Sequence, residues 1–426
     1  MSARRTALLV AVLLGAAVAV VIAVATPWHL LPTPPGGRTP VDPGSAYTAA
    51  QTRRAGDFAD ALRPASLAST VLSLVVAALF GLTRAGAALA RRLARPLGGG
   101  WGWQALLGAI ALVLIGRLVT LPLSVYGEVV EHRYGLSTSS WTLWSRDVAT
   151  NTGIDAGVSA VVVLLLVLLV RKAPRTWWAW ASGLAALLVV VGSFLYPVVI
   201  EPAFNSFEPM PASQLRTDLF ALADKSGTPV QEVLVADASR RTTALNAYVS
   251  GFGSSRRIVV YDNLLDQLPD EQIESIVAHE LGHVQADDVL VGTLIGALGA
   301  AAGVAFLGWL LQFSPLLRRA GATSPGDPAA VGLVLFLVAA GTLVSTPVQD
   351  VYSRHIEARA DRHALDLTRD PDSFIAVQTR LGVANLSDPD PPAFWHWFYG
   401  THPTVPQRIA FAEDWAKVHG VAVDGR

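Results

Sequence analysis

Seven apolar segments divide the chain, and each has about the length that a helix needs to cross a lipid bilayer. Crossing the roughly 30 Å hydrocarbon layer takes about 20 helical residues. The segments lie at 6–26, 66–87, 104–124, 155–171, 178–200, 289–313 and 329–347. This pattern predicts a mainly α-helical, polytopic membrane protein with about seven transmembrane helices, a multi-pass protein of the cell membrane in contact with membrane lipid.

The first segment permits two interpretations. Arg4 and Arg5 precede it, and Ala23-Val24-Ala25 resembles a small-residue site of signal-peptide cleavage. Cleavage would leave six spans. The apolar run is long for the core of a signal peptide, so we favour a retained helix.

Arg117 lies inside the third apolar segment. A charged side chain within a span usually faces a polar cavity or a partner, which would indicate a water-filled interior. The alternative is a side chain that extends toward the membrane interface.

The polar regions between the spans predict further elements. Residues 27–65 are rich in Pro and Gly and then polar, and we expect a loop there. In the region 201–288 we predict a helix at 213–225 with a Ser cap, short strands at 230–235 and 257–262, and a helix that begins at Pro269. The last region, 348–426, begins as a helix through Arg359 and ends in a Trp/Pro-rich segment.

Composition supports a membrane protein and excludes several kinds of site. The chain is 52% hydrophobic and only 15% charged, whereas soluble domains are about a quarter charged. Its net charge of −1 offers no basic surface for nucleic acid. Cysteine is absent, which excludes disulfides, Cys-ligated zinc and a Cys nucleophile.

One pentapeptide carries the pattern of a metal site: His279-Glu280-Leu281-Gly282-His283. Its two histidines are four residues apart and share one face of a helix, so both imidazoles can bind one metal ion. Glu280 is angled to hold a water rather than the metal. Histidine nitrogen is a good zinc ligand, and a catalytic zinc site keeps one position open for water. A chance match on a buried helix is the alternative.

A third ligand is expected from the helix that follows the seventh span. Glu357 and Asp361 are four residues apart there and share a face. Glu357 can bind the metal, while Asp361 can accept the free N–H of a ligating histidine and so fix its tautomer. The alternative is an exposed helix whose charges pair with Arg354 and Arg359. The metal motif favours the first interpretation.

Hydrolysis at such a metal site also needs a general base and a hydrogen-bond donor for the intermediate. Glu280 would take a proton from the metal-bound water and pass it to the leaving amine. The tetrahedral intermediate needs a donor opposite the metal, for which His402 and Arg408 are the best candidates. Asp287 and Asp288 could bind the metal or support its ligands, but we favour their interpretation as the polar boundary of the sixth span.

His355, His363 and His396 are expected to be surface or structural histidines rather than metal ligands.

Several ordered motifs resemble those of the type-I CAAX prenyl endopeptidases, membrane zinc metallopeptidases related to the a-factor-converting enzyme. The resemblance covers nearly the whole chain. In the first half of the chain it rests on HRYGLS at 132–137 and PAFNSF at 202–207. Around the HELGH motif it rests on NAY at 246–248 and the run from Gly251 to Val259. Near the C-terminus it rests on the segment 353–361, with Glu357 and Asp361, and on THP at 401–403 followed by Arg408.

The resemblance implies seven helices around a large internal chamber and a zinc-metallopeptidase domain with a small β-sheet. It implies one Zn²⁺ per chain held by His279, His283 and Glu357, with Glu280 as base. It further implies that Asn246, Ala247 and Tyr248 hold the substrate backbone as an added strand, a contact that does not depend on side-chain sequence. His402 and Arg408 match the residues that support the intermediate.

The function that follows is zinc-dependent hydrolysis of peptide bonds, as in enzymes that remove the C-terminal tripeptide of prenylated CAAX proteins. The partner would be a peptide or protein substrate, with or without a lipid, and nucleic acid is not expected. Two alternatives stay open. One is a heat-shock-type quality-control metalloprotease, and the other is a seven-helix transporter with an incidental HExxH.

Two further expectations concern layout. The chain divides into a membrane domain at 1–200, a metallopeptidase domain at 201–288, two spans at 289–347 and the rest of the catalytic domain at 348–426. Most arginine clusters fall on one side of the seven-span arrangement, and the HELGH helix falls on the other. Because several intervening loops are also basic, we leave open which side faces the cytoplasm.

Overall fold

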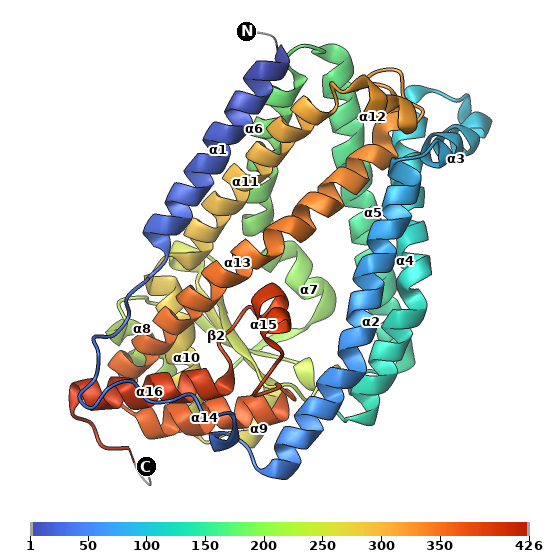
Figure 1. Ribbon diagram of the computed structural model, residues 1–426. Helices are drawn as coiled ribbons and strands as arrows, with labels where there is room; N and C mark the ends of the chain where they lie inside the picture. Colours follow the sequence, from blue (N-terminus) through green and yellow to red (C-terminus); the bar gives the residue numbers. More distant parts are fainter. Residues whose placement is uncertain (1–2, 424–426) are drawn as a thin grey trace.

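Seven long helices form the membrane part of the protein. The computed structural model describes residues 3–423. Within them, seven helices are long and apolar enough to cross a membrane, as expected. They are α1 (Ala3–Ala25), α2 (Ala49–Gly81), α4 (Trp101–Arg133), α5 (Trp141–Lys172), α6 (Trp177–Leu195), α11 (Asp288–Leu310) and α13 (Val331–Thr368). Figure 1 shows them side by side, with the catalytic region at one end and the short helices α3 (Ala85–Ala94) and α12 (Ser314–Arg319) at the other.

A polar cavity lies among these helices. Its volume is about 740 Å³, and α2, α4, α5 and α13 supply its lining. The lining combines apolar residues with seven hydroxyl side chains and two carboxylates: Ser66, Ser69, Thr70, Ser73, Ser124, Thr342, Thr346, Glu128 and Glu131. Arg117 of α4 donates a hydrogen bond of 3.3 Å to Ser124, one of these hydroxyls. The predicted internal chamber is therefore confirmed, and the charge in the third span is directed to its lining.

Exposed aromatic side chains mark both ends of the spans. Trp28, Tyr126 and Tyr196 lie at the catalytic end, and Trp103 and Trp180 lie at the opposite end. Tryptophan and tyrosine collect at membrane–water interfaces because their rings are apolar and their tips are polar. The two groups therefore outline the two membrane surfaces.

The helix α2 begins much earlier than expected. Residues 49–65 were predicted to be loop, which is wrong: Thr48 and Gln51 form a capping box, and α2 starts at Ala49. The capping signal was present in the sequence but lies well ahead of the apolar run. At its other end α2 stops at Gly81 rather than near residue 87. A Cβ on Gly81 would lie 2.7 Å from the carbonyl oxygen of Gly332. Glycine at both positions lets α2 and α13 cross closely.

The segment after α1 is a strap across the catalytic domain, which we define as residues 26–48. Arg362 of α13 donates to the Leu30 carbonyl at 2.8 Å. The Thr39 amide donates to Asp414 of α16 (Val405–His419) at 2.7 Å. Tyr47 is buried in the catalytic core. In this structure α1 therefore belongs to the helical assembly, with its strap tied to the far end of the chain.

The catalytic domain combines a small sheet with short helices. The strands β1 (Phe207–Pro209), β2 (Glu232–Ala236), β4 (Arg257–Tyr261) and β3 (Ala247–Ser250) lie in that spatial order. Only β2 and β4 are parallel, and β3 forms an edge. The helices are α7 (Glu201–Phe204), α8 (Gln214–Lys225), α9 (Asp262–Gln267), α10 (Asp270–Gln285), α14 (Pro371–Ala384), α15 (Ala393–Tyr399) and α16. The predicted α8, with Ser213 as its cap, and the two predicted strands are confirmed to within two residues.

One helix joins the membrane part to the catalytic part. The seventh span continues as α13 without a break to Thr368, beyond the expected end near Arg359. It packs closely against α10, where Gly282 leaves no room for a side chain: a Cβ there would lie 2.9 Å from the Cβ of His363 and 3.1 Å from the Cα of Ala360. The glycine in HELGH thus sets the distance between the two helices.

Gly282→Ala should therefore push α10 away from α13. Overpacking of this kind costs about 1–3 kcal/mol. We expect the free energy of unfolding to fall by that amount and metal affinity to fall with it. Chelator competition and chemical unfolding in detergent would measure both. Gly292→Ala on α11 is the matched control, because its added Cβ would meet no atom within 4 Å. Equal effects of the two substitutions would contradict this account.

Candidate metal centre

The helix α10 carries the HELGH motif because its two sides differ. Asp270 and Glu271 occupy its first turn, where negative charge stabilises the helix dipole. Ile273, Val277 and Leu281 are buried in the core of the domain. The face that carries His279 and His283 is thereby turned toward α13.

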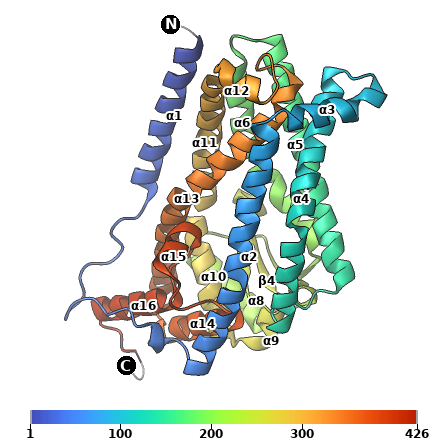
Figure 2. The ribbon, with the colours of Figure 1, turned by 45° about the vertical axis from the view of Figure 1, so that its right-hand side comes forward.

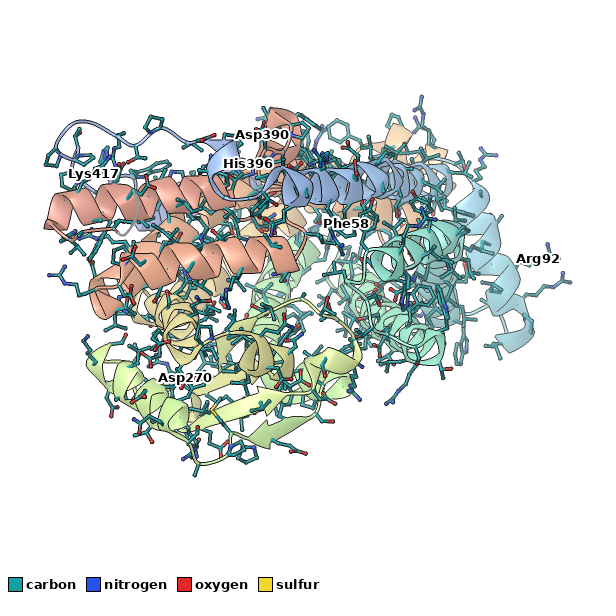
Figure 3. The ribbon with its side chains drawn as sticks, turned by 90° about the horizontal axis from the view of Figure 1, so that it is seen from below. Phe58, Arg92, Asp270, Asp390, His396 and Lys417 are labelled. Carbon is teal, nitrogen blue, oxygen red and sulfur yellow. The ribbon has the colours of Figure 1, made fainter. Side chains whose placement is uncertain are left out.

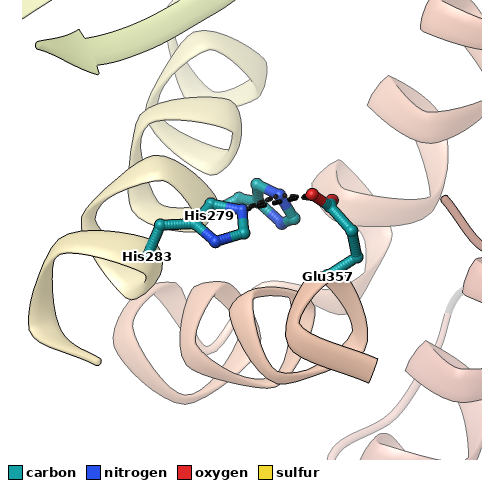
Figure 4. Close-up of side chains that lie close together, drawn as sticks. All are labelled: His279, His283 and Glu357. Atoms are coloured by element: carbon teal, nitrogen blue, oxygen red, sulfur yellow. Dashed lines mark hydrogen bonds and ion pairs between the residues drawn. The ribbon is translucent and has the colours of Figure 1, made fainter. Parts of the chain in front are cut away.

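Three ligand atoms converge where α10 faces α13 (Figure 4). Glu357 Oε2 lies 3.2 Å from His279 Nε2, and Glu357 Oε1 lies 3.5 Å from His283 Nε2. The two imidazole Nε2 atoms are 3.2 Å apart. All three residues offer ligand atoms within 4.8 Å of one another. The residues expected to bind the metal thus come from two distant segments and meet at one point.

The hydrogen bonds of the imidazoles determine which nitrogen faces that point. His279 Nδ1 lies 2.8 Å from Asp361, and His283 Nδ1 lies 2.9 Å from Asp288. Because an ionised carboxylate only accepts, each Nδ1 carries a hydrogen and each Nε2 is the nitrogen that faces Glu357. Metal binding uses the neutral form of each ring, in which Nε2 presents a lone pair beside the buried Glu357 Oε2, an oxygen with no hydrogen-bond partner. Two imidazole nitrogens and a carboxylate oxygen are ligands that a metal ion such as zinc prefers, so the donor set fits a metal ion.

Asp361 lies beside His279, as the helical spacing predicted, and it is paired with Arg408. Arg408 Nε donates to Asp361 Oδ2 at 2.9 Å, and its Nη2 also pairs with this carboxylate. Asp361 is fully buried, so it needs these charged partners. Arg408 therefore reaches the site through Asp361 and His279, and this placement favours a positioning role over direct contact with the substrate.

Asp288 supports a metal ligand, which the sequence interpretation left as the less favoured of two roles. The span boundary was preferred, but Asp288 accepts from His283 and forms an ion pair with Arg359. Arg359 also lies 3.4 Å from the Ala25 carbonyl at the end of α1. Each of the two imidazoles is thus hydrogen-bonded to one carboxylate, and each of these carboxylates is paired with one arginine. The sequence feature that points to this role is an acidic residue five positions after the second histidine, directly after the turn at Asp287.

Glu280 lies beside the ligand group on the same helix. Burial raises the pKa of its carboxyl above the ordinary value. A carboxylate with a raised pKa accepts and releases protons more readily near neutral pH, as a general base needs to do.

His402 reaches the site from the loop after α15. Its Nε2 lies 3.3 Å from Glu357 Oε2, and its Nδ1 lies 2.8 Å from the Thr401 hydroxyl. More than half of the His402 side chain is exposed, so a substrate can reach it. Arg354 of α13 fixes this loop by donating to the carbonyls of His396 and Gly400. Because Nε2 faces the Glu357 carboxylate, which only accepts, we assign the hydrogen to Nε2 and the acceptor role to Nδ1.

The remaining histidines lie outside the ligand group. His355 packs edge-on against Trp28 with ring centroids 5.1 Å apart, and His363 lies 3.1 Å from the Ser226 hydroxyl.

The strand β3 lies beside α10 and forms the edge of the sheet. Asn246 directly precedes it, and its carbonyl accepts from the Tyr261 amide at 3.1 Å. Ala247 and Tyr248 pair with Val260 and Val259 of β4. The opposite edge of β3 carries no strand in residues 3–423.

Two family models together match most of the chain. The model for peptidase family M48 matches residues 209–416. The model described as "CAAX prenyl protease N-terminal, five membrane helices" matches residues 40–206. A Bacillus subtilis protein, "Uncharacterized metalloprotease YhfN", is 33% identical over 304 residues, which are 71% of each chain. The chain belongs to peptidase family M48.

More distant relatives agree. The "CAAX prenyl protease 1 homolog" of Arabidopsis thaliana is 29% identical over 69% of each chain. The crystal structure of S. mikatae Ste24p has the same fold, with a TM-score of 0.75 and 21% identity over 95% of this chain and 98% of that one. This M48 protein is therefore a multi-pass membrane metalloendopeptidase. Its family rules out the transporter interpretation, and the match to the N-terminal model distinguishes it from a heat-shock-type protease.

Asp288→Asn should weaken metal binding without removing a ligand, because the amide cannot support His283 as a carboxylate does. Loss of such a supporting carboxylate typically costs about 10–100-fold in metal affinity. Competition with a chromogenic chelator would measure it. Asp287→Asn is the matched control, because the neighbouring residue has the same chemistry and its positive φ of 52° also suits asparagine. Equal affinities for the two variants would contradict the role of Asp288.

Proposed function

We propose that this M48 protein hydrolyses peptide bonds with one zinc ion per chain, held by His279, His283 and Glu357 in the cell membrane. The observation that carries the proposal is the convergence of two Nε2 lone pairs and an unpartnered carboxylate oxygen. Two histidines, one carboxylate and one open position are the donor set of catalytic zinc in metallopeptidases.

Bound zinc would lower the pKa of water and polarise the scissile carbonyl. Glu280 takes the proton from the attacking water and delivers it to the leaving amine. His402 donates its Nε2 hydrogen to the oxygen of the tetrahedral intermediate. Asp361 with Arg408, and Asp288 with Arg359, hold the two imidazoles in the required tautomer and orientation.

The substrate backbone pairs with the free edge of β3, beginning at Asn246 and continuing along Ala247 and Tyr248. The position of this edge beside α10 supports that pairing. Main-chain hydrogen bonds bind an extended peptide whatever its side chains are. They would place the scissile bond beside Glu280.

For the natural substrate we propose the C-terminus of a membrane-associated protein, cleaved in the manner of CAAX prenyl proteases. Relatives with that name match about 70% of the chain. The polar cavity between the spans supports entry of a peptide at membrane depth. A comparison of one peptide sequence with and without a prenyl group would test the lipid requirement, with cleavage positions read by mass spectrometry. Equal rates for both peptides would limit the proposal to unmodified peptides.

Glu280→Gln should retain the metal and lose catalysis. The amide cannot take a proton, so we expect the rate to fall by roughly three or more orders of magnitude. Metal content by elemental analysis and peptide cleavage would be measured on the same sample. Retained proteolysis at full metal occupancy would exclude Glu280 as the base.

Glu357→Ala should instead lose the metal, because one of three ligands is missing. Chelators should inactivate the wild type in the same way, whereas serine and cysteine reagents should have no effect. One ion per chain in the purified variant would show that the third ligand lies elsewhere, and Asp361 would then be the next candidate.

A further inference from the structure

The short helix α15 exposes large aromatic side chains although it lies outside all seven spans. Its residues are Ala-Phe-Trp-His-Trp-Phe-Tyr, and 62% of Phe394 and 49% of Trp397 are exposed. Trp395 and Tyr399, on the other face, pack toward α2. In Figures 1 and 2, α15 lies at the surface between α13 and α2. Seen from the catalytic end, His396 of this helix is near one edge of the molecule, opposite Asp270 (Figure 3).

The contacts of α15 fix its level along the membrane normal. Leu62, Arg63 and Ser66 of α2 line one cavity together with α15, and the Arg63 guanidinium lies 5.8 Å from the centroid of the Trp395 ring. Arg63 is the last charged residue of α2. On α13 it is held by Arg354, which follows Asp350, the first charged residue of that helix. Both long helices therefore change from apolar to charged at the level of α15.

The lipid-facing surfaces of both helices begin beside α15. On α2, Leu67 lies one turn after Arg63 and starts a row of half-exposed apolar residues, namely Leu67, Val71, Val75 and Leu79. On α13, Val344 and Val348 are exposed one to three turns before Arg354. Trp28 is exposed beside His355 at the same level. The aromatic face of α15 is thus continuous with surface that the bilayer covers.

We propose that α15 is an interfacial helix whose Phe394 and Trp397 side chains insert at the boundary between lipid headgroups and acyl chains. An apolar face with large aromatic residues is typical of helices that lie in the plane of the interface. The segment 391–400 contains no Asp, Glu, Lys or Arg, so its insertion desolvates no fixed charge. The occupant of this face is therefore lipid.

This contact places His402 at the membrane surface. Only Gly400 and Thr401 separate α15 from His402, and Arg354 binds the carbonyls of both His396 and Gly400. The same arginine therefore holds both α15 and the loop that follows it, and His402 at the end of that loop lies 3.3 Å from Glu357.

Site-directed spin labelling tests the proposal without any use of activity. The chain contains no cysteine, so F394C and W397C each provide a single site for a nitroxide label. The proteins would be reconstituted in phosphatidylcholine vesicles, and collisions of the label with oxygen and with a water-soluble nickel chelate would be measured. V71C on the lipid-facing row of α2 is the control for lipid, and E232C, exposed on β2, is the control for water. Circular dichroism would check that each variant is folded.

We expect the ratio of oxygen to nickel collisions at 394 and 397 to approach that at 71 and to exceed that at 232 several-fold. Ratios equal to that at 232 would overturn the proposal. Spin–spin broadening that disappears on dilution with unlabelled protein would also overturn it, because a second copy of the chain would then cover this face. Zinc dependence and peptide cleavage play no part in the measurement, so its failure leaves the proposed function untouched.

Discussion

Two carboxylate–imidazole pairs determine the geometry of the metal centre. A histidine presents a lone pair from one ring nitrogen only when the other holds the hydrogen, and Asp361 and Asp288 each impose that tautomer. With both rings so fixed, Glu357 completes a set of three ligands that could hold one metal ion. The helices around this point serve to bring the pairs together at short range.

The long helix α13 is the element on which this geometry depends. It carries Glu357, Asp361, Arg354 and Arg359, and its first half forms part of the membrane domain. Glycines allow it to approach its neighbours at two levels, Gly332 against α2 and Gly282 of α10 against its catalytic half. Because the same rigid helix spans both parts, the position of the metal relative to the membrane follows from packing rather than from a flexible linker.

The sequence predicted the local features well and the long-range ones only in part. HELGH and the pairing of Glu357 with Asp361 follow from helical spacing, which places residues four apart on one face. The start of α2 was missed because an apolar run was taken to define the whole helix, although a capping box precedes it by many residues. The supporting role of Asp288 was ranked second because an acid at the end of a span is usually a boundary residue. Its partner Arg359 is 71 positions away, and no spacing rule connects them.

The strap links the two ends of the chain to one another and to the active region. Thr39 and Arg38 bind Asp414, some 375 positions later, and Arg359 reaches the carbonyl at the end of α1. Because Asp414 and Arg408 both lie on α16, neither the anchor of the strap nor the arginine that pairs with Asp361 exists until that helix has been synthesised.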